Sequence, residues 1–169
     1  MRRQHIPGVA IAVVREGRIT KAKGYGVADL DHNVPVTPDT VFALASITKQ
    51  FTATLIMVLV EQGKVRLDDE IGQYLDDPPA NWKGITVRHL LNHTGGLSPL
   101  GKDFVSLVRS PNSTTAQMYE AAKGDPIGGK PGEKWDYSDV GYFLLGMIIE
   151  RASGRTYPEL LRETILDPT

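Results

Sequence analysis

The chain has 169 residues, 41% of them hydrophobic and 23% charged, and these proportions exclude a disordered or fibrous protein. Its formal net charge is −1, with acidic and basic residues interspersed, which excludes the one-sided charge that nucleic acid or an anionic membrane would attract. The absence of cysteine excludes disulfides, thiol catalysis and thiolate metal sites.

The organisation of the chain is predicted to be simple. No internal repeat, low-complexity run or linker divides the sequence, so we predict a single domain over residues 1–169. The apolar segments are too short to cross a bilayer, and the first of them carries Pro7 and Gly8 and indicates a strand. The location of the protein stays open, and a cytoplasmic one is expected only if Met1 is the native start.

Two segments near the N-terminus have the composition of β-strands. Residues 9–14 are rich in valine and isoleucine, and Glu16-Gly17 separates them from residues 18–27, a pattern typical of a β-hairpin. Residues 28–39 are polar and contain prolines, so we predict a loop there. Because a lone hairpin is marginally stable and leaves an unpaired edge, we expect it to pair with another segment or a second polypeptide.

The rest of the chain is predicted to be helical. Apolar residues recur at three- and four-residue spacing after Ser46, and Gly63 supplies a stop, which is the clearest helix pattern in the sequence. Thr86 and Thr114 or Thr115 are expected to cap two further helices. The predicted helices cover residues 46–62, 87–93, 115–122, 140–152 and 158–165.

The tetrapeptide Ser46-Ile47-Thr48-Lys49 stands at the start of the clearest helix. Residues three apart on a helix share a face, so the Lys49 amine can reach the Ser46 hydroxyl. A serine needs an adjacent base to act as a nucleophile, and a lysine serves when its pKa is lowered. However, about one such pattern is expected by chance in a chain of this length. Taken alone, the tetrapeptide therefore favours a plain helix N-cap at Ser46 over a catalytic serine.

Several motifs in one order point to a family. They are Ile6-Pro7-Gly8, the glycine-rich residues 23–26, the tetrapeptide at Ser46, residues 90–97 (LLNHTGGL) and residues 130–146 (KPGEKWDYSDVGYFLLG). Together they make residues 6–169 resemble the N-terminal portion of the serine β-lactamase and D-alanyl-D-alanine peptidase superfamily, in the class C-like branch with the β-lactamase-like esterases. The resemblance implies an α+β fold, in which the hairpin belongs to an antiparallel sheet and a helical lobe carries the serine.

The resemblance also implies roles for individual residues. Ser46 is expected to be the nucleophile, while Lys49 and Tyr137 handle its proton. Asp139 stands where the family's Tyr-x-Asn motif has asparagine, and an ionised aspartate favours the charged form of Lys49, so Tyr137 is the preferred base. Asp139 and Trp135 are expected to contact the substrate or support the site.

One family feature is missing from the sequence. The third motif, Lys-Thr-Gly or a His-x-Gly or Trp-x-Gly variant, is expected on a later strand, and no such triplet follows Tyr137. In the family that strand also supplies a second oxyanion N–H, and losing one such donor costs about 10²–10³ in rate. We therefore expect a truncated chain that lacks the C-terminal strands with which the hairpin would pair.

These observations predict a serine hydrolase that forms an acyl-enzyme on an ester, β-lactam or D-alanyl peptide carbonyl, with short-chain esters favoured by analogy. Two other classes stay open: an incomplete or non-catalytic fragment that needs a second polypeptide or C-terminal segment, and a binding module that has lost catalysis. The unpaired hairpin edge favours self-association or a complementing chain. No cofactor, metal or nucleic-acid partner is expected, and His93 is interpreted as a helix-end residue rather than a catalytic one.

Overall fold

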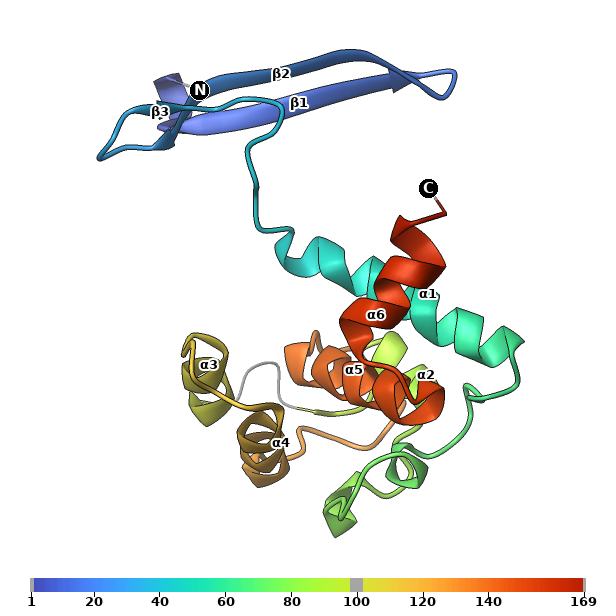
Figure 1. The fold of residues 1–169 in the computed structure, drawn as a ribbon. Coiled ribbons are helices and arrows are strands. Elements are labelled where there is room, and N and C mark those ends of the chain that lie inside the picture. The colour runs from blue at the N-terminus through green and yellow to red at the C-terminus, as the bar shows by residue number, and fades with distance from the viewer. Residues whose placement is uncertain (1, 98–101, 169) are drawn as a thin grey trace. The chain divides into compact units, whose positions relative to one another are not determined.

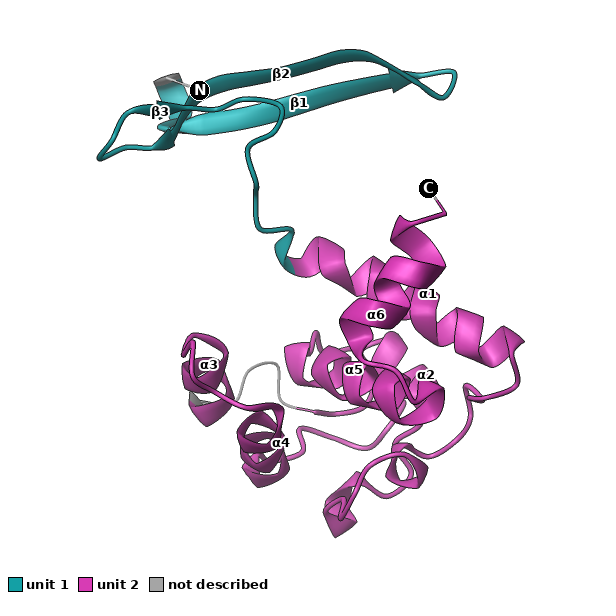
Figure 2. Cartoon of the chain, viewed as in Figure 1, with its two compact units in different colours: residues 1–45 teal, residues 46–169 magenta. Residues whose placement is uncertain are grey.

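The computed structural model describes residues 2–97 and 102–168. The chain divides into two compact units, residues 1–45 and residues 46–169 (Figure 2). The first unit contains the strands and the second contains the long helices (Figure 1). The assignment of a single domain stays a prediction. No helix in the described part of the chain has the length and apolar character needed to span a membrane.

An antiparallel sheet makes up most of the first unit. Strand β1 (Gly8–Arg15) pairs with β2 (Arg18–Asp29), which confirms the predicted hairpin, and β2 also pairs with the short β3 (Val34–Pro35). A short 3-10 turn, η1 (Arg2–Gln4), precedes β1. The prediction of a loop over residues 28–39 is wrong at β3, because a strand of two residues is too short to leave a pattern in the sequence.

Backbone geometry explains two glycines of this unit. At the hairpin turn Glu16 and Gly17 have φ angles of 52° and 72°, and two successive positive φ angles match the twist of the flanking strands. In β2, a Cβ atom on Gly24 would lie 2.0 Å from the carbonyl oxygen of Val36, so only glycine fits against the chain that follows β3. The glycine-rich segment therefore serves the close packing of β2.

The second unit is helical. The elements from Ala45 onward are η2 (Ala45–Ile47), α1 (Thr48–Glu61), η3 (Ile71–Gln73), η4 (Ala80–Trp82), α2 (Val87–Leu91), α3 (Lys102–Val108), α4 (Thr115–Gly124), α5 (Asp139–Ser153), α6 (Tyr157–Leu161) and the π-helical turn η5 (Arg162–Leu166). The helices α1, α2, α4, α5 and α6 confirm five predictions. The sequence did not predict α3, because its seven residues are too few for a clear period.

Side-chain caps fix where several helices begin. Thr86 and His89 form a capping box at α2, in which the Thr86 hydroxyl accepts from the His89 N–H and the His89 ring accepts from the Thr86 N–H. Thr114 caps α4 and Ser138 caps α5, while Gly154 ends α5 in the left-handed conformation. Helix α2 ends at Leu91, earlier than predicted.

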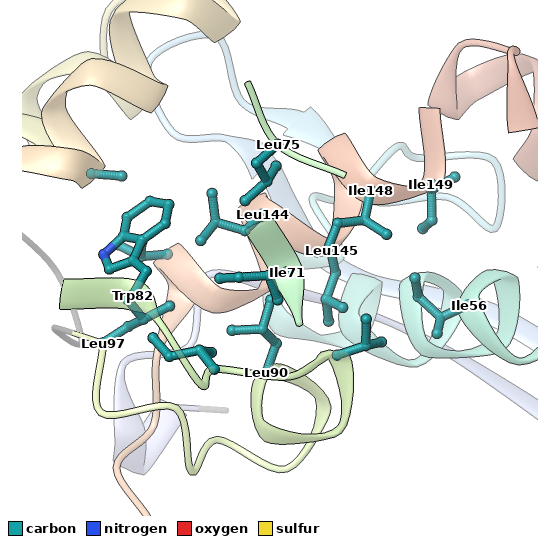
Figure 3. Close-up of a cluster of buried hydrophobic side chains, with 14 of the residues drawn as sticks. Ile56, Ile71, Leu75, Trp82, Leu90, Leu97, Leu144, Leu145, Ile148 and Ile149 are labelled. Carbon is teal, nitrogen blue, oxygen red and sulfur yellow. The ribbon is translucent and has the colours of Figure 1, made fainter. Parts of the chain in front are cut away.

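One hydrophobic core holds the second unit together (Figure 3). Helix α5 lies at its centre and packs against α1, α2 and α6. Because α5 carries apolar residues on several faces, it buries side chains toward each of these neighbours. The fully buried core includes Leu55, Ile56, Leu59, Ile71, Ile85, Leu90, Leu144, Leu145, Ile148 and Ile149. This core fixes α1 and α5, the two helices whose N-terminal ends carry the predicted site residues.

Candidate active site

Ser46 lies in the 3-10 turn η2, which continues directly into α1, and its side chain is exposed. The residue before it, Ala45, has a φ angle of 46°, a strained conformation for a residue other than glycine. Lys49 follows three residues later, and its Nζ donates to Ser46 Oγ over 3.5 Å. The predicted approach of these two side chains is therefore present, although Ser46 precedes the α-helix proper.

Tyr137 reaches the same serine from a segment 91 residues further along the chain. Its phenolic Oη donates to Ser46 Oγ over 2.9 Å. The next residue, Ser138, is buried and caps α5, with its Oγ accepting from the Gly141 N–H over 3.0 Å. Because Tyr137 is attached to a capped helix in the core, its position relative to Ser46 is determined by the packing of α5 against α1.

Asp139, the first residue of α5, forms an ion pair with Lys49. Burial of the Lys49 amine acts to lower its pKa, but the hydrogen bonds and charges of Asp139 and Tyr137 outweigh burial and raise the pKa above the ordinary value of 10.5. Lys49 is therefore an ammonium at neutral pH, as expected from the aspartate at this position. A charged lysine cannot accept a proton from Ser46.

The Lys49 ammonium also lies over two aromatic rings. Its Nζ is 4.7 Å from the centre of the Tyr137 ring and 5.4 Å from the centre of the Tyr142 ring. The Tyr142 hydroxyl donates to the Leu91 carbonyl at the end of α2, and burial raises the pKa of Tyr142. These contacts hold the cation beside the Tyr137 phenol, where it stabilises negative charge.

Trp135 provides an exposed aromatic surface next to the site. Its side chain is 66% exposed, and its ring centre lies 6.3 Å from that of Tyr137. A large apolar ring left open beside an exposed serine is suited to contact a small molecule. The predicted site residues Ser46, Lys49, Tyr137, Asp139 and Trp135 therefore come together in one place.

His93 also belongs to this group, although the sequence interpretation left it out. It follows α2 with a φ angle of 58°, and its ring lies 4.4 Å from the Tyr137 ring and 5.1 Å from the Tyr142 ring, measured between centres. Its position in the LLNHTGGL segment, which carries part of the family resemblance, was the signal that could have drawn attention to it.

The rest of that segment supports the chain leading to Tyr137. The Thr94 carbonyl accepts from the Gly132 N–H, and the Gly96 carbonyl accepts from the Gly128 N–H, each over 2.7 Å. Gly96 has a φ angle of 72°, and a Cβ atom there would lie 2.5 Å from the Gly129 carbonyl oxygen. Gly96 thus allows the backbone to approach the segment that carries the tyrosine.

A cavity of the helical unit lies elsewhere. It has a volume of about 690 Å³ and is lined by parts of α4 and α5 and by residues 74–76. Its polar groups already have partners, because Arg151 pairs with Asp76, and the Tyr119 hydroxyl donates to the Asp76 carbonyl. Among the described residues, no group of histidine and carboxylate side chains is arranged to hold a metal.

Comparison with known proteins decides the family. The model of the Beta-lactamase family matches residues 1–169. The chain belongs to this family. Protein flp of Staphylococcus aureus (strain N315) is 33% identical over 172 residues, which cover 99% of this chain and 34% of that protein. The chain therefore spans about a third of the length of this relative.

Solved structures agree with the family and the fold. The octameric penicillin-binding protein homologue from Pyrococcus abyssi matches with a TM-score of 0.86 and 36% identity, over 99% of this chain and 40% of that one. The D-amino acid amidase from Ochrobactrum anthropi SV3 matches with a TM-score of 0.86 and 32% identity, over 99% of this chain and 46% of that one. The predicted superfamily, its N-terminal portion and the α+β fold are confirmed, and the chain belongs to a superfamily of serine hydrolases.

Proposed function

We propose that this beta-lactamase family chain carries a serine hydrolase site in which Ser46 is the nucleophile and Tyr137 exchanges its proton. The observation that supports the proposal most strongly is the 2.9 Å hydrogen bond between Tyr137 Oη and Ser46 Oγ, with Lys49 beside both oxygens. A serine becomes nucleophilic only when an adjacent group takes its proton. Since Lys49 is held as a cation by Asp139, Tyr137 is the group that can do so.

The proton path follows from the charges. In the resting site the Tyr137 phenol donates to Ser46, so Tyr137 must first release this proton to solvent water, and the Lys49 ammonium stabilises the resulting negative oxygen. The phenolate then accepts the Ser46 proton as Ser46 Oγ bonds to the substrate carbonyl carbon. Tyr137 passes this proton to the leaving group as the bond between that group and the carbonyl carbon breaks, which completes the acyl-enzyme. In hydrolysis Tyr137 takes a proton from water as the water oxygen bonds to the acyl carbon, and it returns that proton to Ser46 Oγ as the bond between Ser46 Oγ and the acyl carbon breaks.

Short-chain esters are the proposed substrates. An alkoxide or phenolate leaves more readily than an amine, so ester cleavage needs less help from a proton donor at the leaving group. The site offers one proton-exchanging group, Tyr137, and the exposed ring of Trp135 as an apolar surface for a small acyl chain. β-Lactam and D-alanyl peptide carbonyls are the other proposed substrates, and their rates of hydrolysis are to be compared with those of the esters.

Amides of D-amino acids are a second candidate class. The observation in their favour is the 32% identity and the TM-score of 0.86 to the D-amino acid amidase over 99% of this chain. Amide cleavage requires protonation of the departing nitrogen, a step that Tyr137 would supply from the same position. The comparison of a D-phenylalanine amide with an ester of equal size distinguishes the two classes.

Hydrolysis of p-nitrophenyl butyrate by the 169-residue chain tests the proposal. Wild type is compared with Ser46→Ala and with Thr54→Ala, a matched control that removes another exposed hydroxyl from the same helical segment. We expect turnover in wild type and Thr54→Ala, and loss to the uncatalysed rate in Ser46→Ala. Equal rates in wild type and Ser46→Ala would contradict the proposal for this chain.

An incomplete or non-catalytic fragment is the alternative function. It is favoured by the exposed apolar side chains of the hairpin, among them Ile11, Val13 and Val14 of β1, and by the coverage of about a third of the relative. Strand β1 pairs only with β2 in the described residues, so we propose that its free edge binds a second copy of the chain. Sedimentation of a monomer at all concentrations would contradict self-association.

A further inference from the structure

His93 contacts both neighbours of the proposed base. Its backbone carbonyl accepts from the Asp136 N–H over 2.8 Å, and its ring Nδ1 accepts from the Ser138 N–H over 3.1 Å. Asp136 and Ser138 lie directly before and after Tyr137. One residue from the end of α2 therefore fixes the backbone on each side of the tyrosine.

The His93 ring adds a third contact to the same residue. It stacks on the Tyr137 ring with a distance of 4.4 Å between centres and an angle of 31° between planes. On the same imidazole the Tyr142 ring stacks at 5.1 Å and 32°. The tyrosine ring is thus held by the histidine while its hydroxyl reaches Ser46. His93 itself has no contact with Ser46 among the described interactions.

The contact with Ser138 requires a neutral imidazole, because a protonated Nδ1 would itself be a donor. Burial lowers the pKa of His93, and the charge of Lys49 on α1 lowers it further, whereas Asp139 on α5 and the backbone hydrogen bond with Ser138 act in the opposite direction without outweighing burial. The other rings facing the imidazole are the phenols of Tyr137 and Tyr142 and the indole of Trp135. The histidine is accordingly neutral at pH 7 and able to accept the hydrogen bond.

We propose that His93 is a positioning residue for Tyr137, holding the phenol against Ser46 through its backbone carbonyl, its ring acceptor and its stacked ring. The inference rests on the proposed function, since it assigns His93 to the same reaction. It gives His93 no proton-transfer step. The expected effect of losing it is a displaced tyrosine, and a misplacement of about 1 Å can lower a rate by about 10²-fold.

Three substitutions of His93 separate the contribution of its ring acceptor from that of its stacked ring. Asparagine and glycine both tolerate the positive φ angle of His93, but only His93→Asn keeps an acceptor close to the position of Nδ1. His93→Gly is therefore its matched partner without an acceptor. His93→Phe keeps a ring for stacking and removes the acceptor, although its positive φ angle is strained.

The first readout needs no turnover. In a ¹H–¹⁵N spectrum the Ser138 amide is expected at the low field of a hydrogen-bonded proton in wild type and in His93→Asn, and at higher field in His93→Gly and His93→Phe. On acidification the wild-type signal should move upfield below the ordinary histidine value of about 6.5, and the His93→Asn signal should not. An amide signal that is the same in wild type and His93→Gly overturns the proposal.

The second readout is hydrolysis of p-nitrophenyl butyrate. We expect kcat to fall by about 10²-fold in His93→Gly with little change in KM, and to recover in His93→Asn to within about tenfold of wild type. Equal kcat values in His93→Asn and His93→Gly would overturn the positioning role. If wild type shows no turnover, the proposed function fails for this chain, while the Ser138 amide still decides whether His93 holds the segment.

Discussion

At the scale of single residues, opposing effects act on Lys49. Burial disfavours its charge, and the partnership with Asp139 favours it more strongly, so the pKa is raised. A raised pKa means that the folded state holds the proton more tightly than the unfolded state. The resulting stability is fully present below the ordinary lysine value of 10.5 and is lost as the pH rises through the pKa of the folded state.

This dependence of stability on the Lys49 proton predicts how the free energy of unfolding changes with pH in Asp139→Asn. The substitution removes the acceptor and charge that raise the pKa of Lys49 and leaves the burial that lowers it. We expect the free energy of unfolding of wild type to fall more steeply than that of Asp139→Asn above pH 10, as measured by urea titration at pH 8 and pH 11. Parallel pH curves would show that Asp139 does not hold the Lys49 proton.

At the scale of elements, the backbone of residues 93–96, after α2, positions the segment that leads into α5. Gly96 allows this approach, since it has a φ angle of 72° and lies against the Gly129 carbonyl. Its neighbour Gly95 has room for a methyl group, with the nearest atoms at 3.4 Å. Gly95→Ala is therefore a matched control for Gly96→Ala.

We predict that Gly96→Ala lowers the free energy of unfolding by on the order of 1–3 kcal/mol, because it combines a strained φ angle with a backbone clash. Gly95→Ala should change it by much less. Urea unfolding of the three proteins measures the difference, and ester hydrolysis should decline with Gly96→Ala as the segment before Tyr137 shifts. If Gly96→Ala changed neither the free energy of unfolding nor the rate of ester hydrolysis, residues 93–96 would not support that segment.

Local patterns explain which elements could be predicted from the sequence. The hairpin and the helices at α1 and α5 carry long periodic patterns, and Thr86 and Thr114 mark helix starts through their own side chains. Strand β3 and helix α3 are too short for such patterns. The Ser46–Lys49 contact follows from helical spacing, whereas Tyr137 was found by family resemblance, because 91 residues separate it from Ser46. The role of His93 depends on contacts across more than 40 residues, which no local pattern records.

At the scale of the whole molecule, the question is whether this chain alone contains a reactive serine. The helical unit, residues 46–169, holds Ser46, Lys49 and Tyr137 at the N-terminal ends of two helices that share one core. The hairpin unit exposes apolar side chains, and the chain spans about a third of its relative. The residues proposed to exchange the proton therefore all belong to one unit, and a second oxyanion donor is the part expected from a later strand.

Covalent trapping of the reactive serine tests the central claim most directly. The chain would be incubated with a fluorophosphonate ester, and the mass of the intact protein and of its peptides would locate any adduct. We predict one adduct on Ser46, formed about 10²–10⁴-fold more slowly in Tyr137→Phe, because that variant lacks the proton acceptor. An adduct formed at the same rate in wild type and Tyr137→Phe, or absent from Ser46 altogether, would contradict the account.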